Sequence, residues 1–199
     1  MTPRSELQPL GHSIAVWQRY DPHVKADLWS TAVHTAAGVY IIDPIPVDQD
    51  SLAQFVGESP IAAVIVTNEN HVRDAPSFCS AFGAPLFARF SVSLSAISTI
   101  RTNESVAGLT IIDLPGAPLG EISIIDSQGN LVVGDALINF EPYGFTFLPD
   151  KYCTEPEQLR RSLRALLDHD FHRLFFAHGT PITSNAHRRL ESLLGSAHD

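Results

Sequence analysis

The sequence predicts an α/β protein in which two β-sheets pack against each other and helices cover the outer faces. The first observation is the order of the expected elements, because a group of strands followed by a helix occurs twice along the chain. The second is the composition: 44% of the 199 residues are hydrophobic and 18% are charged, which is typical of a well-packed globular protein. A chain of this length can bury a substantial core, so we expect one domain over residues 1–199.

The first half of the chain contains both strand and helix patterns. Short apolar runs separated by turn residues predict strands at residues 12–20, 27–34, 39–42 and 61–66. Apolar residues at helical spacing predict helices over residues 47–58 and 74–82. Asp48 and Asp50 fall in the first turn of the earlier helix, where their charges suit the positive end of the helix dipole.

The second half repeats this order. Strands are expected at residues 85–88, 108–112, 121–126 and 130–134. The residues 127–130 form a hairpin turn between the last two of these strands. Thr154 and Glu157 have the spacing of a capping box and predict the start of a leucine-rich helix. A final strand over 171–177 and a closing helix over 184–194 complete the pattern.

The loop after the strand at 61–66 carries an unusual set of polar residues. Residues Val66 to Asp74 read V-T-N-E-N-H-V-R-D. This loop resembles the T-H-x-H-x-D-H motif of metallo-β-lactamase-fold hydrolases, whose three His and one Asp help to hold two metal ions. The positions of those four ligands are occupied here by Asn68, Asn70, Val72 and Arg73.

Four other segments resemble the same family in the same order. They are a strand ending at Asp43-Pro44, a P-G-A-P-L-G run with Ala117 at a metal-binding His position, a strand ending at Gly134-Asp135, and a strand ending at His178-Gly179. In the family, the Asp of the Gly-Asp segment bridges the two metal ions. The resemblance spans most of the chain and implies an αββα sandwich of two mixed β-sheets with outer helices.

Five of the seven metal-ligand positions implied by the resemblance are changed, and only Asp135 and His178 keep the residue type of the family. A catalytic zinc ion usually has three protein ligands and one open position. Amide side chains are poor zinc ligands, and the fixed charge of Arg73 repels a cation. We therefore predict that the ordinary dinuclear centre is lost and that no cofactor is bound, which leaves open whether the protein is an enzyme.

Three interpretations of the altered site follow. If the fold is that of the family, Asn68, Asn70, Arg73, Asp135 and His178 meet at one end of the sandwich. In the first interpretation the protein is a pseudoenzyme, and Arg73 pairs with Asp135 only to keep the old site folded. In the second, the amides, the guanidinium and the imidazole bind a small anionic molecule such as a carboxylate or a phosphate.

The third interpretation keeps metal chemistry. His71, Asp74, Asp135 and His178 could form a shifted mononuclear site for zinc or another divalent metal, and the protein would then be a hydrolase with an atypical centre. The plainer roles for the two new residues are an exposed loop histidine for His71 and a helix N-cap for Asp74. We rank this interpretation third, because ligand distances in metal sites are held tightly.

Charge and hydropathy limit the partners. The formal net charge of −9 argues against nucleic acid, although Arg160, Arg161 and Arg164 form a basic helix face that we interpret as solvated. No run of about 20 apolar residues could cross a membrane, and we expect a cytoplasmic protein in which Cys79 and Cys153 stay reduced. The apolar-rich segment from Phe140 to Leu148 fits either a pocket wall or a homodimer contact.

Overall fold

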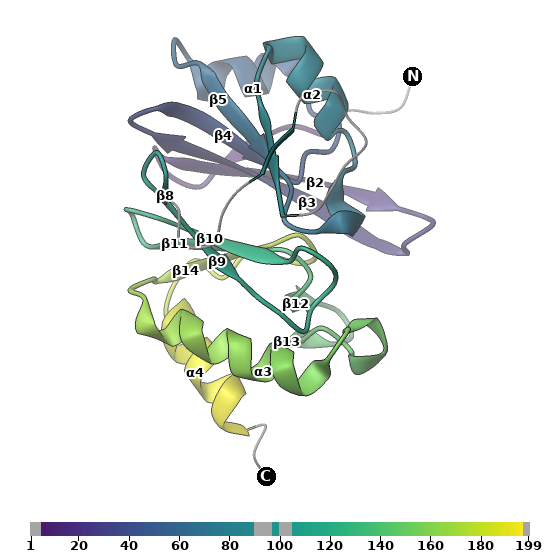
Figure 1. Ribbon diagram of the computed structural model, residues 1–199. Helices are drawn as coiled ribbons and strands as arrows, with labels where there is room; N and C mark the ends of the chain where they lie inside the picture. Colours follow the sequence, from purple (N-terminus) through teal and green to yellow (C-terminus); the bar gives the residue numbers. More distant parts are fainter. Residues whose placement is uncertain (1–4, 90–96, 100–104, 197–199) are drawn as a thin grey trace.

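Both faces of the central strands are apolar, and this explains why the fold has four layers. The computed structural model describes residues 5–89, 97–99 and 105–196. In β4 (Gly38–Ile42), Val39 and Ile41 pack toward helices, whereas Tyr40 and Ile42 pack toward the other sheet. In β11 (Asn130–Val133), Leu131 and Val133 pack toward the opposite helices. The resulting order of layers is helix, sheet, sheet and helix (Figure 1).

The first sheet is mixed. Its strands, in spatial order, are β1 (Gln8–Pro9), β2 (Ile14–Asp21), β3 (Ala26–Thr35), β4, β5 (Ile61–Ile65), β6 (Leu86–Ala88) and β7 (Ile97–Thr99). Pairing is antiparallel from β1 to β4 and parallel from β4 to β7. The outer face is covered by α1 (Gln49–Val56) and α2 (Ala75–Phe82).

The second sheet is also mixed. Its strands, in spatial order, are β14 (Arg173–Phe176), β11, β10 (Ile122–Asp126), β9 (Leu109–Asp113) and β8 (Ser105–Val106). Only the β11–β14 pair is parallel. Two helices cover its outer face, α3 (Pro156–Arg164) and α4 (Ala186–Ser196). The predicted αββα sandwich of two mixed sheets with outer helices is confirmed.

A separate hairpin lies beside β14. It consists of β12 (Leu137–Phe140) and β13 (Gly144–Phe147), which pair only with each other among the described strands. The backbone N–H of Asn139 donates to the carbonyl of His178 at 3.1 Å, and the N–H of Thr180 donates to the carbonyl of Asn139 at 2.9 Å. The sequence pattern indicated an apolar segment here but did not predict the two strands.

Three short 3₁₀ helices complete the described elements. They are η1 (Glu69–His71), η2 (Asp150–Tyr152) and η3 (Ala165–Asp168).

The predicted capping box of α3 is wrong: Glu155 is the N-cap and makes no capping side-chain hydrogen bond. Thr154 Oγ1 instead donates to the carbonyl of Ala117 at 2.9 Å, so it ties the helix to the loop before β10.

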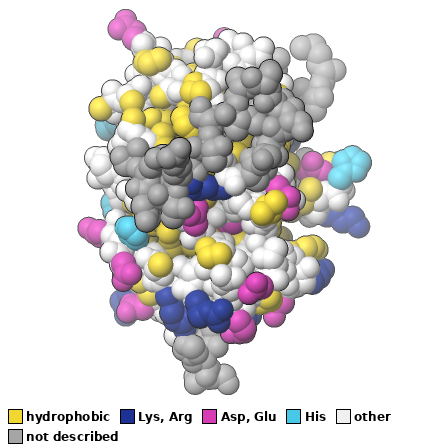
Figure 2. All heavy atoms as spheres, viewed as in Figure 1, with side chains coloured by type: hydrophobic (Ala, Val, Ile, Leu, Met, Phe, Trp, Pro, Cys, Tyr) yellow, Lys and Arg dark blue, Asp and Glu magenta, His cyan; other side chains and the backbone are white. Residues whose placement is uncertain are grey.

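Arg160, one of the three basic residues of α3, is paired with acidic side chains. Figure 2 shows basic and acidic side chains together over the lower half of the molecule, where α3 lies. Arg160 makes ion pairs with Asp150 at 3.0 Å and with Glu157 at 2.7 Å. In the described residues, no helix is long and apolar enough to span a bilayer.

Candidate metal centre

Four strands deliver polar residues to one edge of the sandwich. Asp43 follows β4, the segment Thr67–His71 follows β5, Asp135 follows β11 and His178 follows β14. Within each sheet these strands are parallel neighbours, so their carboxyl ends lie at the same edge. The two sheets therefore bring the residues from both halves of the chain together.

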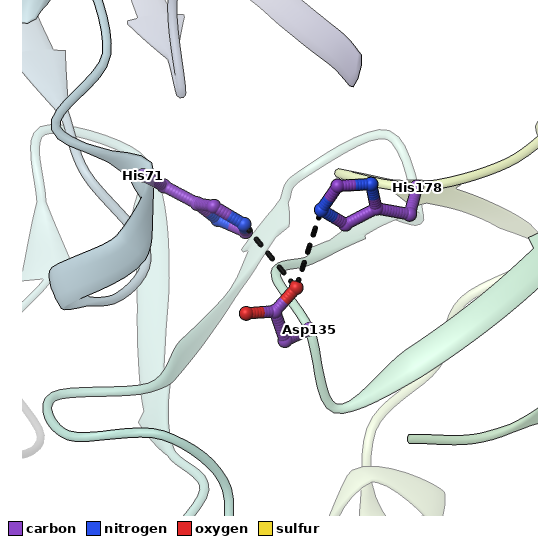
Figure 3. Close-up of side chains that lie close together, drawn as sticks. All are labelled: His71, Asp135 and His178. Atoms are coloured by element: carbon purple, nitrogen blue, oxygen red, sulfur yellow. Dashed lines mark ion pairs between the residues drawn. The ribbon is translucent and has the colours of Figure 1, made fainter. Parts of the chain in front are cut away.

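Three side chains meet in the centre of this edge. His71 Nε2 lies 3.2 Å from Asp135 Oδ1, and His178 Nε2 lies 3.4 Å from the same oxygen. Figure 3 shows both imidazole rings directed at the same oxygen of this carboxylate. One ligand atom from each of the three residues lies within 4.8 Å of the others. In the described part of the chain, His71, Asp135 and His178 form the group whose residue types and spacing fit a metal site.

The orientation of His71 is fixed through its other nitrogen. His71 Nδ1 lies 2.9 Å from Asp43 Oδ2 and 2.8 Å from Thr67 Oγ1. The hydroxyl of Thr67 donates to Asp43, so Nδ1 must carry a proton and act as the donor. In the neutral ring, the lone pair is then on Nε2, which is buried and faces Asp135 Oδ1. A carboxylate that orients a histidine in this way is typical of metal ligands.

Two amides hold the other oxygen of Asp135. Asn68 Nδ2 donates to Asp135 Oδ2 at 3.1 Å, and Asn70 Nδ2 donates to it at 3.4 Å. This division leaves Oδ1 facing the two imidazoles. Asn68 Oδ1 also accepts from the backbone N–H of Asn70 at 2.9 Å, which fixes the start of η1.

The charges in the centre are strongly coupled. Burial and the nearby Arg73 oppose a charged His71, but the carboxylates of Asp43 and Asp135 outweigh them and raise the pKa of His71 to about 9. Burial favours the neutral acid at Asp135, but the two imidazoles hold its pKa well below the usual range. Burial and the charge of His71 lower the pKa of His178 to about 4. Without a metal ion, His71 is therefore the charged partner of both carboxylates.

Glu121 is a buried acid that the sequence did not indicate. It is 4% exposed; Oε2 accepts from Asn68 Nδ2 at 2.6 Å and Oε1 accepts from the N–H of Ala136 at 3.1 Å. Burial and the charge of Asp135 raise the pKa of Glu121 to about 8, so it is largely neutral at pH 7. Ala117, at the missing histidine position, packs into the core beneath α3 and α4.

Arg73 lies near the centre but does not pair with Asp135. Its Nη1 donates to the backbone carbonyls of Trp29 at 2.8 Å and Asp43 at 3.2 Å. In the described residues there is no ion pair between Arg73 and Asp135, so the predicted pairing is wrong. The histidines take that role because both rings approach Asp135 Oδ1 directly.

The remaining predicted residues have different outcomes. His71 is 2% exposed, so its interpretation as an exposed loop histidine is wrong. Asp74 precedes α2 as its N-cap residue without a capping side-chain bond, and it does not belong to the described three-residue group. Val72 packs against the core beneath α1 and α2. Asp43 and Thr67 were noted only as strand ends, and no local pattern indicated that they hold a histidine.

A model of the metallo-beta-lactamase superfamily matches residues 11–197. The chain belongs to this superfamily. No curated protein matches it. The family resemblance in the sequence is thus confirmed over nearly the whole chain.

Solved structures agree on the fold at low sequence identity. The structure of the DIM-1 metallo-beta-lactamase exposed to ceftazidime superposes with a TM-score of 0.76 at 14% identity, covering 99% of both chains. A metallo-beta-lactamase from Erythrobacter litoralis gives 0.73 at 11% identity and covers 98% of both. A metallo-beta-lactamase family protein from Thermus thermophilus gives 0.67 at 18% identity, covering 96% of this chain and 81% of that one. At such identities the likeness establishes the fold alone.

Proposed function

We propose that this protein is a metal-dependent hydrolase with a single divalent ion held by His71, Asp135 and His178. The observation that carries the proposal is that one ligand atom from each of these three residues lies within 4.8 Å of the others. Two imidazoles and one carboxylate that meet in this way form a donor set that suits a divalent ion. This is the mononuclear alternative from the sequence, with Asp74 removed from the ligand set.

The distances support a metal ion of ordinary size. Zinc lies roughly 2.1 Å from its nitrogen and oxygen ligands, so two ligands of a tetrahedral ion are about 3.4 Å apart. The measured separations from Asp135 Oδ1 are 3.2 Å to His71 and 3.4 Å to His178. Two imidazoles and one carboxylate also suit iron and manganese, so the donor set by itself does not select the metal.

The Asn68 side of the centre supports one ion rather than two. Asn68 and Asn70 stand at family histidine positions, and both donate to Asp135 Oδ2. Glu121 fills the adjacent space and is held by Asn68 and by a backbone N–H. The amide donors of both asparagines and the two oxygens of Glu121 are thus already used within the protein, which favours one ion.

The residues around the centre have separate parts in the proposed chemistry. A bound divalent ion lowers the pKa of a coordinated water and so supplies a nucleophile at neutral pH. Asp43 and Thr67 keep the lone pair of His71 turned toward the centre. The two amides keep Asp135 in one orientation, with Oδ1 facing both imidazoles.

Binding of a small anion by Asn68, Asn70, Arg73, Asp135 and His178 has weaker support. The amide groups of both asparagines already donate to carboxylates, and Arg73 Nη1 donates to two backbone carbonyls. Arg73 Nη2 is buried without a partner and is the donor that remains. An anion in this centre would also face the charge of Asp135.

The deciding experiment is the metal content of protein purified without chelators and without a histidine tag. We expect close to one zinc, iron or manganese ion per chain, lost in His71→Asn and kept in the control His12→Asn, whose imidazole is exposed. Hydrolysis of chromogenic ester, thioester and lactam substrates should disappear with the metal and return when it is added back. Protein that stays metal-free during incubation with each ion would contradict the proposal.

A further inference from the structure

The metal centre opens into a large cavity. Its volume is about 970 Å³, and the side chains of His71, Asp135 and His178 form part of its lining. The other walls come from the β2–β3 turn, from η1, and from the hairpin β12–β13 with the segment that follows it. Binding pockets for small molecules have volumes of roughly 300–1,000 Å³, so this cavity has room for a molecule of that class.

One set of cavity walls is apolar and exposed. Val24, Tyr143 and Tyr152 line the cavity and are 55%, 59% and 58% exposed. Leu28 and Ile138 also line the cavity, and both are buried. Exposed apolar side chains gathered around a hollow mark a binding surface, because water is displaced from them when a ligand enters. These walls therefore suit the apolar body of a ligand.

The chain has only two lysines, Lys25 and Lys151, and both line this cavity. The other eleven basic residues are arginines. Lys25 is in the β2–β3 turn with a φ of 59°, and its backbone N–H donates to the carbonyl of Asp21 at 2.7 Å. Lys151 belongs to η2, and its Nζ lies 4.6 Å from the centre of the Tyr152 ring. The two lysines thus come from separate segments of the cavity lining.

The acidic residues of the cavity are mostly engaged elsewhere. Asp21 accepts from the backbone N–H groups of His23 and Val24, and Asp135 is held by the histidines and asparagines of the centre. Glu69 is the exposed acid that opposes the lysines. Arg73 adds a buried Nη2 without a partner to the basic side. The lining therefore carries three acids, Asp21, Glu69 and Asp135, and its exposed cationic groups are the two lysines.

We propose that the cavity binds a small amphipathic anion, whose acid group lies at Lys25 and Lys151 and whose apolar body lies against Val24, Tyr143 and Tyr152. This assignment rests on the proposed function, because it names the substrate class of the same site. The bond to be hydrolysed would lie near the metal centre, and the two lysines of the lining would hold the acid group.

Lysine labelling tests the proposal directly, because Lys25 and Lys151 are the only side-chain amines in the chain. Metal-free protein would be acetylated with an amine-specific reagent, and the rate at each lysine would be read by peptide mass spectrometry. The probe is 1-octanesulfonate below its micelle concentration, since sulfonates coordinate metals weakly. The controls are 1-octanol, which lacks the acid, and methanesulfonate, which lacks the apolar body.

We expect octanesulfonate to slow labelling of both lysines at least fivefold, with little effect from either control compound. Equal protection by octanol would overturn the anionic part of the proposal, and equal protection by methanesulfonate would overturn the apolar part. Nα-acetyl-lysine amide added to each reaction reports whether a compound merely consumes reagent. No protection by any compound would overturn the whole assignment.

Matched variants separate this inference from the metal site. By calorimetry, Lys25→Met and Lys151→Met should each weaken octanesulfonate binding about tenfold. Arg161→Met removes an exposed charge on α3 outside the cavity and should leave binding unchanged. Unchanged binding in both lysine variants would overturn the proposal. Metal content is measured on the same samples: metal with no octanesulfonate binding overturns only the substrate class, and octanesulfonate binding without metal overturns only the hydrolase.

Discussion

The two oxygens of Asp135 face two different environments. Oδ1 faces the imidazoles of His71 and His178, which offer lone pairs or protons, whereas Oδ2 accepts from the amides of Asn68 and Asn70. Beyond the amides lies Glu121, a buried acid that is largely neutral at pH 7. The difference teaches that one carboxylate can serve two kinds of surroundings: one side has a donor set that suits a metal ion, and the other is a hydrogen-bond network of amides and an acid.

The largest expected effect is on metal content, and a pair of substitutions tests the two sides of Asp135 separately. Asp135→Asn removes the carboxylate that both imidazoles approach, so metal content should fall to near zero. Glu121→Gln changes only the hydrogen-bonded side and should keep about one ion per chain. Elemental analysis of both variants provides the measurement. Loss of metal in Glu121→Gln with a native circular dichroism spectrum would show that the two sides are not separable.

The next effect concerns the support of His71. Asp43→Ala leaves His71 without its orienting carboxylate, and we expect the metal affinity to fall on the order of 10–100-fold. Competition with a chromophoric chelator measures this change. Asp48→Ala is the matched control: it removes the cap of α1, costs about 1 kcal/mol of stability and should leave metal affinity unaltered.

A smaller effect tests the close packing between the two sides. A Cβ at Gly134 would lie 2.5 Å from Thr67 Oγ1 and 2.8 Å from Glu121 Oε1, so Gly134→Ala must displace both side chains. We expect a loss of about 1–3 kcal/mol in the free energy of unfolding, and weaker metal binding because Thr67 contacts His71. Gly195→Ala, in α4 with open space around the new Cβ, should be neutral or slightly stabilising. Equal denaturation midpoints for the two variants would contradict this.

The smallest effect is the pH dependence of the metal-free protein. The pKa of His71 rises from 6.5 to about 9 on folding, so its contribution is complete below pH 6.5 and is lost as the pH rises through 9. Glu121, raised from 4.5 to about 8, changes stability in the same direction, while the lowered pKa of His178 acts only below pH 6.5. Stability should therefore fall as the pH rises from 6.5 to 9.

Urea unfolding at several pH values measures this slope. The slope should be shallower in Glu121→Gln, because one titrating group is gone. Bound metal should also reduce it, because the ion takes the place of the proton on His71. A midpoint that rises with pH over this window would contradict the assigned charge of His71.

The layers of the fold could be predicted because their signals are local. Each apolar strand and each leucine-rich helix carries its own periodicity, and the order of elements then selects the sandwich. The hairpin β12–β13 was missed because its strands are short, half-buried and interrupted by Glu141-Pro142-Tyr143, so neither strand has a clear alternation.

The site could be predicted only in part. Asp135 and His178 were found because they keep a family residue at a strand end. Burial of His71 depends on Asp43, 28 residues away, and Glu121 meets Asn68 across 53 residues. No local pattern records such contacts. The Arg73 prediction failed for the same reason, since its carbonyl partners on Trp29 and Asp43 exist only in the folded chain.

The hairpin β12–β13 would allow the cavity to change shape while the candidate metal centre stays in place. Ile138 and Phe140 line the cavity, while Asn139 between them binds the backbone on both sides of Gly179. Successive residues of a strand point to opposite faces, so replacing Ile138 or Phe140 reshapes the cavity and leaves the support of His178 in place. Inserting one residue would exchange the two faces of the strand, and would disrupt both the cavity wall and the contact with the backbone around Gly179. This wall should therefore tolerate substitutions but not changes in length.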